Sequence, residues 1–282
     1  MILIADSGST KTDWCVSEQG KQLQWVTTQG INPFFLSEDA IGEEIRSSLL
    51  PKLQTSTFDA LYFYGAGCLP EEIQMMQNAL GKSLNVKTVE VNSDILAAAR
   101  GLSGRNPGII CILGTGSNSC YYDGKKIVSN IPPLGFILGD EGSGAVLGKL
   151  LVGNMLKNQL PAELKEKFLQ EFDLTPTMII ERVYRQSFPN RFLASLSPFL
   201  LRNIEEPALR SLVFNSFCSF LTRNVMQYDY KTFPVYFIGS IAYYYREILE
   251  EAVLATGMQL GGIMQHPMEG LVKYHEKTVV VL

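Results

Sequence analysis

The sequence predicts an α/β protein with a duplicated architecture, in which two lobes enclose a central cleft. Residues 2–26 and residues 109–128 each predict the same series: a strand, a polar turn rich in Gly, Ser and Thr, a second strand, a turn and a third strand. Segments with helical periodicity then follow both copies. Because two copies of one pattern begin the two halves of the chain, the sequence indicates two related lobes.

The first half begins with three predicted antiparallel strands, joined by the polar turn 6–12 and a second turn at 18–20. The apolar period then changes to that of a helix, as the spacing of Ile41, Ile45 and Leu49 indicates. The remaining elements expected in this half are a helix at 38–50, a strand at 61–64, a helix at 71–80, a strand at 86–91 and a helix at 94–100.

A dense cluster of turn-forming residues at 101–108 predicts the boundary between the lobes. We therefore expect an N-terminal lobe at 1–104 and a C-terminal lobe at 105–282. The C-terminal lobe contains a helical insertion over 142–230, which prolines interrupt, and then returns to a strand at 235–238. A helix at 243–255, a short strand near Ile263 and a last helix after Pro267 complete it, and that last helix is expected to pack back on the N-terminal lobe.

The composition indicates an ordinary globular protein. Hydrophobic residues make up 46% of the chain, and the net charge of -4 gives no basic excess with which to neutralise nucleic acid. No apolar run approaches the ~20 residues that a membrane helix needs. The amino terminus lacks the basic segment of a secretory signal. We expect a cytoplasmic protein without nucleic-acid or membrane partners. The five cysteines have no zinc or redox spacing, which favours buried free thiols.

The first polar turn has the composition of a phosphate-binding loop, because backbone amides in a tight Gly-rich turn converge on one concavity. Lys11 would add a positive charge, and Asp6 at the end of the strand could hold Mg²⁺ through water. An ordinary hairpin turn explains the same residues equally well. The expected phosphate contacts in this turn are Gly8, Ser9, Thr10, Lys11 and Thr12.

A second turn, in the same place in the second copy, strengthens this interpretation. A third segment at 235–242 predicts a strand that runs through Gly-Ser into a helix, where small residues could admit adenosine, although glycine there is also explained by backbone geometry. Neither turn matches a P-loop or the three-glycine dinucleotide pattern. The expected nucleotide contacts from these two segments are Gly114, Thr115, Gly116, Ser117, Gly239 and Ser240.

These motifs occur in an order that resembles a known family. The chain contains Asp-Ser-Gly-Ser-Thr-Lys-Thr-Asp, then Gly-Thr-Gly-Ser-Asn, then Gly-Asp-Glu-Gly-Ser, and finally Gly-Ser before a helix. This order resembles the BadF/BadG/BcrA/BcrD ATPase family, and within it the N-acetylglucosamine kinase branch of the sugar kinase, heat-shock protein 70 and actin superfamily. The resemblance implies a duplicated actin-like, or ribonuclease H-like, fold that binds ATP and Mg²⁺ between its lobes, with a sugar deeper in the cleft.

The resemblance also implies an activity, the ATP-dependent transfer of a phosphoryl group to a hydroxyl of N-acetylglucosamine or a related amino sugar. Phosphoryl transfer needs a carboxylate that accepts the proton of the acceptor hydroxyl. Asp94, at the start of a predicted helix that Asn92 or Ser93 could cap, matches the family's base. Without the resemblance, Asp94 would only complement the positive end of that helix. The implied sugar contacts are Asn32, Asp94, Thr115, Asp140 and Glu141.

One departure from the family and two rival functions stay open at this point. Where better-known sugar kinases have Ser-Gly-Gly-Asp, this chain has Gly65-Ala66-Gly67-Cys68, so the identity of the sugar is open. The first rival is an ATPase that activates an iron-sulfur enzyme, which the scattered cysteines disfavour. The second is a non-catalytic sensor of nucleotide and sugar. A homodimer is compatible with the kinase function and with both rival functions.

Overall fold

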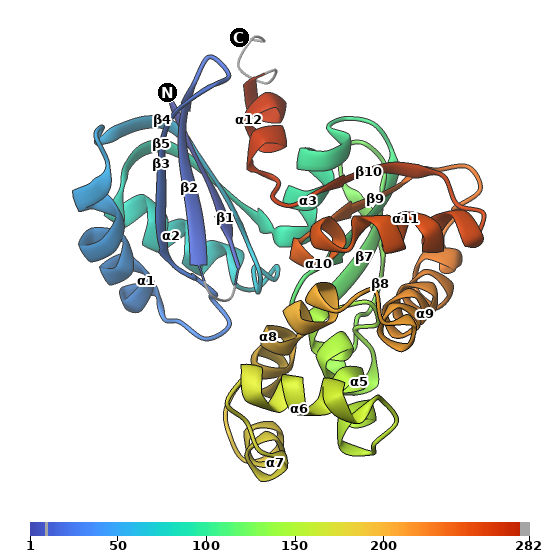
Figure 1. Ribbon diagram of the computed structural model, residues 1–282. Coiled ribbons are helices and arrows are strands. Elements are labelled where there is room, and N and C mark those ends of the chain that lie inside the picture. Colours follow the sequence, from blue (N-terminus) through green and yellow to red (C-terminus); the bar gives the residue numbers. More distant parts are fainter. Residues whose placement is uncertain (9–10, 277–282) are drawn as a thin grey trace. The chain divides into compact units, whose positions relative to one another are not determined.

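The computed structural model of the chain describes residues 1–8 and 11–276 (Figure 1). The chain divides into two compact units, the first made of Met1–Asn106, Gly124–Lys126 and the segment from His266, and the second of Pro107–Asp123 and Ile127–Gln265. Each unit contains one mixed five-stranded sheet with helices packed on it, which confirms the predicted duplicated α/β fold.

The sheet of the first unit has the strand order β3-β2-β1-β4-β5. The first three strands are antiparallel neighbours, whereas β4 and β5 run parallel to β1. The carboxyl ends of β1, β4 and β5 therefore meet at one edge, where α/β proteins bind ligands. The strands are β1 (Ile2–Ser7), β2 (Lys11–Glu18), β3 (Lys21–Gln29), β4 (Thr57–Gly65) and β5 (Asn85–Ser93).

Helices cover both faces of this sheet. On one face, α1 and α2 pack over apolar side chains such as Leu3, Phe63 and Val91, and Figure 1 shows these two helices on the same side of the strands. On the other face, α3 and α12 contact each other and cover residues such as Ile4 and Tyr64. The helices of this unit are α1 (Glu38–Glu44), the π-helical turn Ile45–Leu49, the 3-10 turn Leu50–Lys52, α2 (Ile73–Ser83), α3 (Asp94–Ser103) and α12 (Met268–Glu276).

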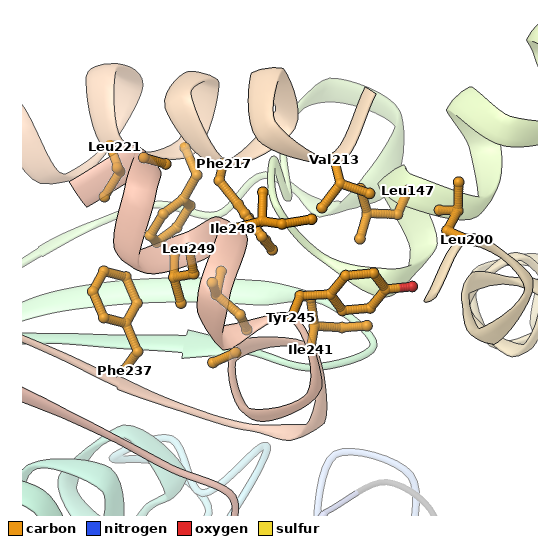
Figure 2. Packing of buried hydrophobic residues seen from close by; sticks show 14 of the residues in the cluster. Leu147, Leu200, Val213, Phe217, Leu221, Phe237, Ile241, Tyr245, Ile248 and Leu249 are labelled. Atoms are coloured by element: carbon orange, nitrogen blue, oxygen red, sulfur yellow. The ribbon is translucent and has the colours of Figure 1, made fainter. Parts of the chain in front are cut away.

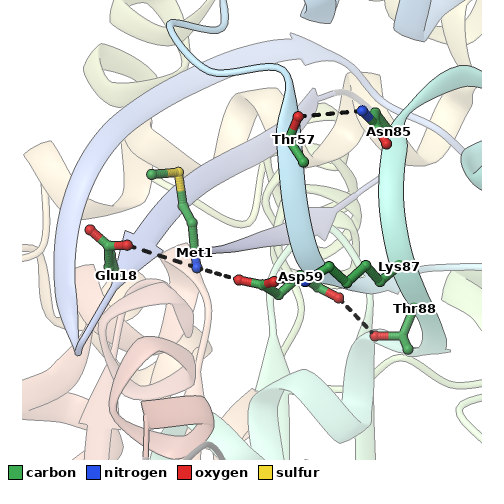
Figure 3. A network of polar contacts seen from close by, with 7 residues as sticks. All are labelled: Met1, Glu18, Thr57, Asp59, Asn85, Lys87 and Thr88. Atoms are coloured by element: carbon green, nitrogen blue, oxygen red, sulfur yellow. Dashed lines mark hydrogen bonds and ion pairs between the residues drawn. The ribbon is translucent and has the colours of Figure 1, made fainter.

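The far end of the same sheet is held by exposed ion pairs (Figure 3). The amino group of Met1 donates to Asp59 at 2.8 Å, and Lys87 donates to the other oxygen of the same carboxylate at 2.6 Å. These two hydrogen bonds, Lys87 first, lower the pKa of Asp59 to about 2. These ion pairs join β4 and β5 to the residue before β1. They contribute little stability because solvent screens exposed charges.

A buried polar network attaches α12 to the first sheet. The ring of His275 stacks on Tyr62, and its Nε2 lies 2.8 Å from the hydroxyl of Tyr64. Arg100 donates to that hydroxyl oxygen at 2.7 Å and to Glu90 at 2.7 Å. Which of the Tyr64 hydroxyl and Nε2 donates to the other depends on the tautomer of His275, and Nδ1 is buried without a hydrogen-bond partner among the described residues.

We expect His275 to make the protein sensitive to acid. Burial, and then the charge of Arg100, lower its pKa from 6.5 to about 3. Below pH 6.5 the unfolded chain binds a proton that the folded chain refuses, so stability is lost as the pH falls from about 6.5 toward 3. At pH 5 the loss is about 2 kcal/mol. Urea unfolding of His275→Gln, which can still hydrogen-bond to Tyr64, should change less between pH 7.5 and 5 than wild type; equal changes would contradict this assignment.

The sheet of the second unit has the order β10-β9-β6-β7-β8. Here β6, β7 and β8 are antiparallel neighbours, and β9 and β10 run parallel to β6. This repeats the arrangement of the first sheet, which the sequence indicated through its two copies of one strand pattern. The strands are β6 (Gly108–Leu113), β7 (Ser117–Tyr122), β8 (Ile127–Ile131), β9 (Val235–Ile238) and β10 (Leu260–Met264).

A large apolar core joins the helices of the second unit to its sheet. Figure 2 shows Phe217 and Leu221 of α9 beside Leu249 of α11, with Phe237 of β9 in the same cluster. Four helices, α6 to α9, have proline at their first position or N-cap, where no intrahelical hydrogen bond is lost. The helices are α4 (Gly135–Leu138), α5 (Gly144–Leu156), α6 (Ala162–Glu171), α7 (Pro176–Tyr184), α8 (Pro189–Arg202), α9 (Pro207–Arg223), the 3-10 turn Val225–Gln227, α10 (Ser240–Tyr244) and α11 (Arg246–Ala255).

Several predicted elements differ from the structure at their ends, and three of them differ in the ways that follow. The helix expected at 38–50 is α-helical only to Glu44, and its later part becomes π-helical before Pro51. The helix expected at 243–255 is two helices, which separate at the buried Tyr245. The strand expected at 125–128 is β8 (Ile127–Ile131). Within the described residues, no helix is both long and apolar enough to cross a bilayer.

Candidate functional site

The carboxyl edge of the first sheet brings together residues that are distant in the sequence. The register pairs Ser7 with Gly65 and Gly65 with Ser93, so β1, β4 and β5 end at the same level. Asp94 directly follows β5, and Asp6 is the penultimate residue of β1. The two aspartates predicted for chemistry therefore lie at one edge of one sheet.

The first polar turn is only partly described, because Ser9 and Thr10 lie outside the described residues. The amide of Gly8 donates to the carbonyl of Lys11 at 3.0 Å and closes the turn. Among the described residues, a side chain at Gly8 would meet the carbonyl of Lys11, at an ordinary 3.8 Å.

Thr12 has a different position from the one expected. The side chain is fully buried, and its hydroxyl donates to the carbonyl of Gln29 at 3.0 Å while lying 2.7 Å from the hydroxyl of Ser7. The amide of Ile31 donates to both hydroxyls. The expectation that Thr12 contacts phosphate is therefore corrected: Thr12 and Ser7 hold the segment that leads to Asn32.

Lys11 and the carboxylates around it form a charged group on the first hairpin. Lys11 Nζ donates to Asp13 at 2.6 Å, and Thr27 donates to the other oxygen of Asp13 at 2.8 Å. Asp13 faces Asp6 across the hairpin. Burial first, and then the charges of Asp94 and Asp13, raise the pKa of Asp6 to about 7 against a smaller opposing effect of Lys11. Negative charge therefore exceeds positive charge at this edge.

This donor set fits Mg²⁺. Carboxylate oxygens are the protein ligands that Mg²⁺ prefers, usually one or two of them with substrate phosphates and water completing the shell. The described residues contain no group of three His, Cys, Asp or Glu side chains arranged around one point. Asp6, with the nearby Asp13, thus matches a cation that is held mainly by its substrate.

Asp94 occupies the first position of α3. Its Oδ1 accepts the amide of Ile95 at 2.8 Å, and burial raises its pKa above the usual value. Ser93 stands at the N-cap, but its side chain makes no capping hydrogen bond, and Asn92 instead donates to Glu90 at 2.8 Å. The expected caps are therefore wrong, and Asp94 is fixed by the backbone of its own helix.

The second polar turn is built into its own unit by backbone contacts. The amide of Gly144 donates to the carbonyl of Gly114 at 2.8 Å, and that of Ala145 to the carbonyl of Thr115 at 3.1 Å. Thr115 itself is exposed, whereas Ser117 is buried. A side chain at Gly116 would lie 3.0 Å from Asp140 Oδ2, so the turn and Asp140 are immediate neighbours.

Asp140 adopts a left-handed backbone conformation that side chains rarely take, with φ of 54°. The amide of Ser117 donates to its carboxylate, while burial raises its pKa to about 6. The structure thus places Asp140 beside Gly116 and Ser117 of the second turn.

Glu141 points elsewhere. Its carboxylate pairs with Arg223 and accepts a 3.5 Å hydrogen bond from Asn224. It lines a pocket between α5 and α9 that does not include Asp140. This corrects the expectation that both carboxylates face a sugar, because helix α9, about 80 residues later in the chain, supplies the partner of Glu141.

Gly239 joins β9 to α10 next to the second turn. Its φ is 116°, and a side chain there would come within 2.4 Å of the carbonyl of Leu113. Only glycine fits this position. Ser240, the first residue of α10, is exposed. Gly239 and Gly114 therefore lie together at the carboxyl ends of β9 and β6.

Sequence reasoning missed three residues of these sites. Asp13 was named in a motif but given no role, although the predicted hairpin already placed it near Asp6. Ser7 was given no role either, and a buried hydroxyl has no signal in sequence. Arg223 lies on a helix whose neighbours the sequence does not specify.

Of the five cysteines, Cys15, Cys68, Cys111 and Cys120 are buried and Cys218 is partly buried.

No protein-family model and no curated protein matches the chain. Solved structures do. A proposed N-acetylglucosamine kinase from Porphyromonas gingivalis is 52% identical with a TM-score of 0.96, over 99% of this chain and 100% of that one. A proposed N-acetylglucosamine kinase from Chromobacterium violaceum is 17% identical with a TM-score of 0.73, over 97% and 98%.

A ROK family glucokinase from Streptomyces griseus, in complex with glucose and AMPPNP, is 14% identical with a TM-score of 0.56 over 97% of each chain. The two structures of low identity show the shared fold alone. The likeness at 52% identity extends over practically the whole of both chains, and shows family membership.

Proposed function

Since the chain belongs to the N-acetylglucosamine kinase branch of the BadF/BadG/BcrA/BcrD ATPase family, we propose that it transfers the γ-phosphoryl group of ATP to a hydroxyl of N-acetylglucosamine or a closely related amino sugar. The observation that carries this proposal is the position of Asp94, directly after β5 at the carboxyl edge that also contains Asp6. Phosphoryl transfer to a hydroxyl requires one carboxylate that accepts the proton of the hydroxyl and, close to it, a carboxylate that binds the cation.

In this proposal Asp94 is the general base. Its Oδ1 accepts the Ile95 amide, which leaves Oδ2 to accept the proton of the attacking hydroxyl. The raised pKa makes it a stronger base than an exposed aspartate while it is ionised. Within the first unit, Asn32 is assigned to orient the acceptor. Within the second unit, the polar groups assigned to a ligand are Asp140 and the exposed Thr115.

The nucleotide is assigned to the two polar turns and to the Gly239-Ser240 junction. In this assignment Lys11 offers its charge to phosphate, and Gly8, Gly114 and Gly116 allow close approach to the backbone of each turn. The amides of Gly8, Gly114 and Ser117 already donate to Lys11, Gly116 and Asp140. Mg²⁺, with Asp6 and Asp13 as its protein carboxylates, supplies neutralisation of the phosphate charge. The ion pair with Asp13 fixes the position of the Lys11 ammonium group.

The identity of the sugar is tested by measuring the formation of ADP from ATP, in the presence of Mg²⁺, with a panel of acceptor sugars. We expect release to depend on an added amino sugar, with N-acetylglucosamine above glucosamine, N-acetylmannosamine, N-acetylmuramic acid and glucose. Mass spectrometry should find the product heavier by one phosphoryl group. Release that is equal with and without every sugar would contradict the kinase assignment, and a preference for glucose would contradict the amino sugar.

A further inference from the structure

The loop after β4 places a glycine against the side chain of Asn32. Gly67 has φ of 79°, in the left-handed region that favours glycine. A Cβ built on it would lie 2.1 Å from Asn32 Oδ1 and 2.9 Å from Asn32 Cγ. Real Cβ atoms do not approach so closely, so the amide group of Asn32 occupies the space that a side chain at position 67 would need.

The orientation of the Asn32 amide is determined from its other side. Oδ1 accepts the backbone amide of Phe34 at 3.0 Å, which identifies this atom as the oxygen because an N–H must meet an acceptor. The carbonyl of Asn32 accepts the amides of Phe35 and Leu36 at 3.0 and 3.1 Å. Among residues 1–8 and 11–276, no hydrogen bond uses Asn32 Nδ2, which therefore has two N–H donors to offer a ligand.

The loop that contains Gly67 has little freedom to move away. The amide of Ala66 donates to the carbonyl of Ser7 at 3.0 Å, and the amide of Leu69 donates to the carbonyl of Gly67 at 2.8 Å. Cys68 is buried. A change at position 67 would therefore displace the Asn32 side chain rather than the loop.

We propose that Gly67 is the positioning residue that sets the direction in which Asn32 presents its Nδ2 donors, and so selects the acceptor oxygen of the sugar. This inference rests on the proposed kinase function. The segment Gly65-Ala66-Gly67-Cys68 offers no side-chain hydroxyl and no carboxylate to a ligand, so within the first unit the selection of the acceptor falls to the base Asp94 and to the placement of Asn32.

Gly67→Ala should raise the KM for the amino sugar about 10-fold, the loss expected for one hydrogen bond, while kcat at saturating sugar and the KM for ATP change less than 3-fold. The matched control is Gly104→Ala in the same unit, where φ is 64° and nothing lies within 4 Å of the added Cβ. This control separates backbone strain from the collision, and should leave the KM for sugar unchanged.

A double-mutant cycle with Asn32→Ala tests whether Gly67 acts through Asn32. In the Asn32→Ala background, which leaves room at position 67, Gly67→Ala should raise the KM by less than 2-fold. Asn32→Asp keeps the acceptor for Phe34 but loses the donors, and should raise the KM without any change at Gly67. This variant also serves if Gly67→Ala does not fold.

Additive effects in the cycle, or a normal KM in Asn32→Asp, would overturn the positioning role. Sugar-dependent ADP release by the wild type is measured first and on its own. Its absence would reject the kinase function, whereas an active wild type with an unaffected Gly67→Ala variant would reject only the role of Gly67.

Discussion

Asp94→Asn should lower kcat by roughly 10²- to 10⁴-fold, the usual contribution of a general base. An amide keeps the Oδ1 acceptor that the Ile95 amide needs, so α3 should begin at the same residue. An amide cannot accept the proton of the sugar hydroxyl, however. The Kd for ATP should stay within about 3-fold of wild type, because nucleotide contacts are assigned to other residues. Steady-state kinetics with ADP detection and calorimetric titration of ATP measure the two quantities.

The control for this variant is Asp59→Asn, on the same sheet. Asp59 is an exposed aspartate on β4 with partners in Met1 and Lys87, and it has no place in the proposed site. Its replacement should leave kcat unchanged. If Asp94→Asn retained more than a third of the wild-type kcat, Asp94 would not be the base.

Asp6→Asn should weaken the Mg²⁺-dependent reaction roughly 10- to 100-fold, as expected for a group that holds a metal through water. The pKa of Asp6 is raised to about 7, chiefly by burial, so the ionised fraction of the carboxylate increases as the pH rises through about 7. Wild-type kcat/KM at limiting Mg²⁺ should therefore rise between pH 6 and pH 8. The variant should lack this rise, and a normal pH profile in Asp6→Asn would contradict the assignment.

The same substitution should stabilise the protein. The folded-state pKa of about 7 lies above the ordinary value of 3.8, so stability is lost as the pH rises from about 4 through about 7. An asparagine does not incur this loss. The Tm of Asp6→Asn should exceed that of wild type at pH 8, and the difference should be smaller at pH 5. A lower Tm at pH 8 would mean that the carboxylate is not destabilising, and that the cause given for its raised pKa is wrong.

The order of strands, turns and helices at the carboxyl ends of the two sheets was predictable because it depends on local signals. Apolar strand-length runs that end in polar turns predicted the positions of Asp6 and Gly114, and the strand-to-helix junction at 91–95 predicted that of Asp94. The parallel strands then bring Asp6 and Asp94 together in the first sheet, and Gly114 together with Gly239 in the second. The roles of individual hydroxyls and carboxylates were less predictable, since Thr12 and Glu141 each point away from the expected ligand.

By itself, the sequence determined the two repeated strand patterns, the polar turns and the residue types at the ends of the strands, because alternation and turn chemistry act over a few residues. The tertiary structure alone decided that Thr12 faces Ser7 and Gln29, that Glu141 finds Arg223, and that the backbone of Gly67 meets Asn32. Apart from the contact of Thr12 with Ser7 within one hairpin, these contacts join segments that are not adjacent in the chain. Their partners are chosen by strand register and helix packing, and no local pattern records that choice.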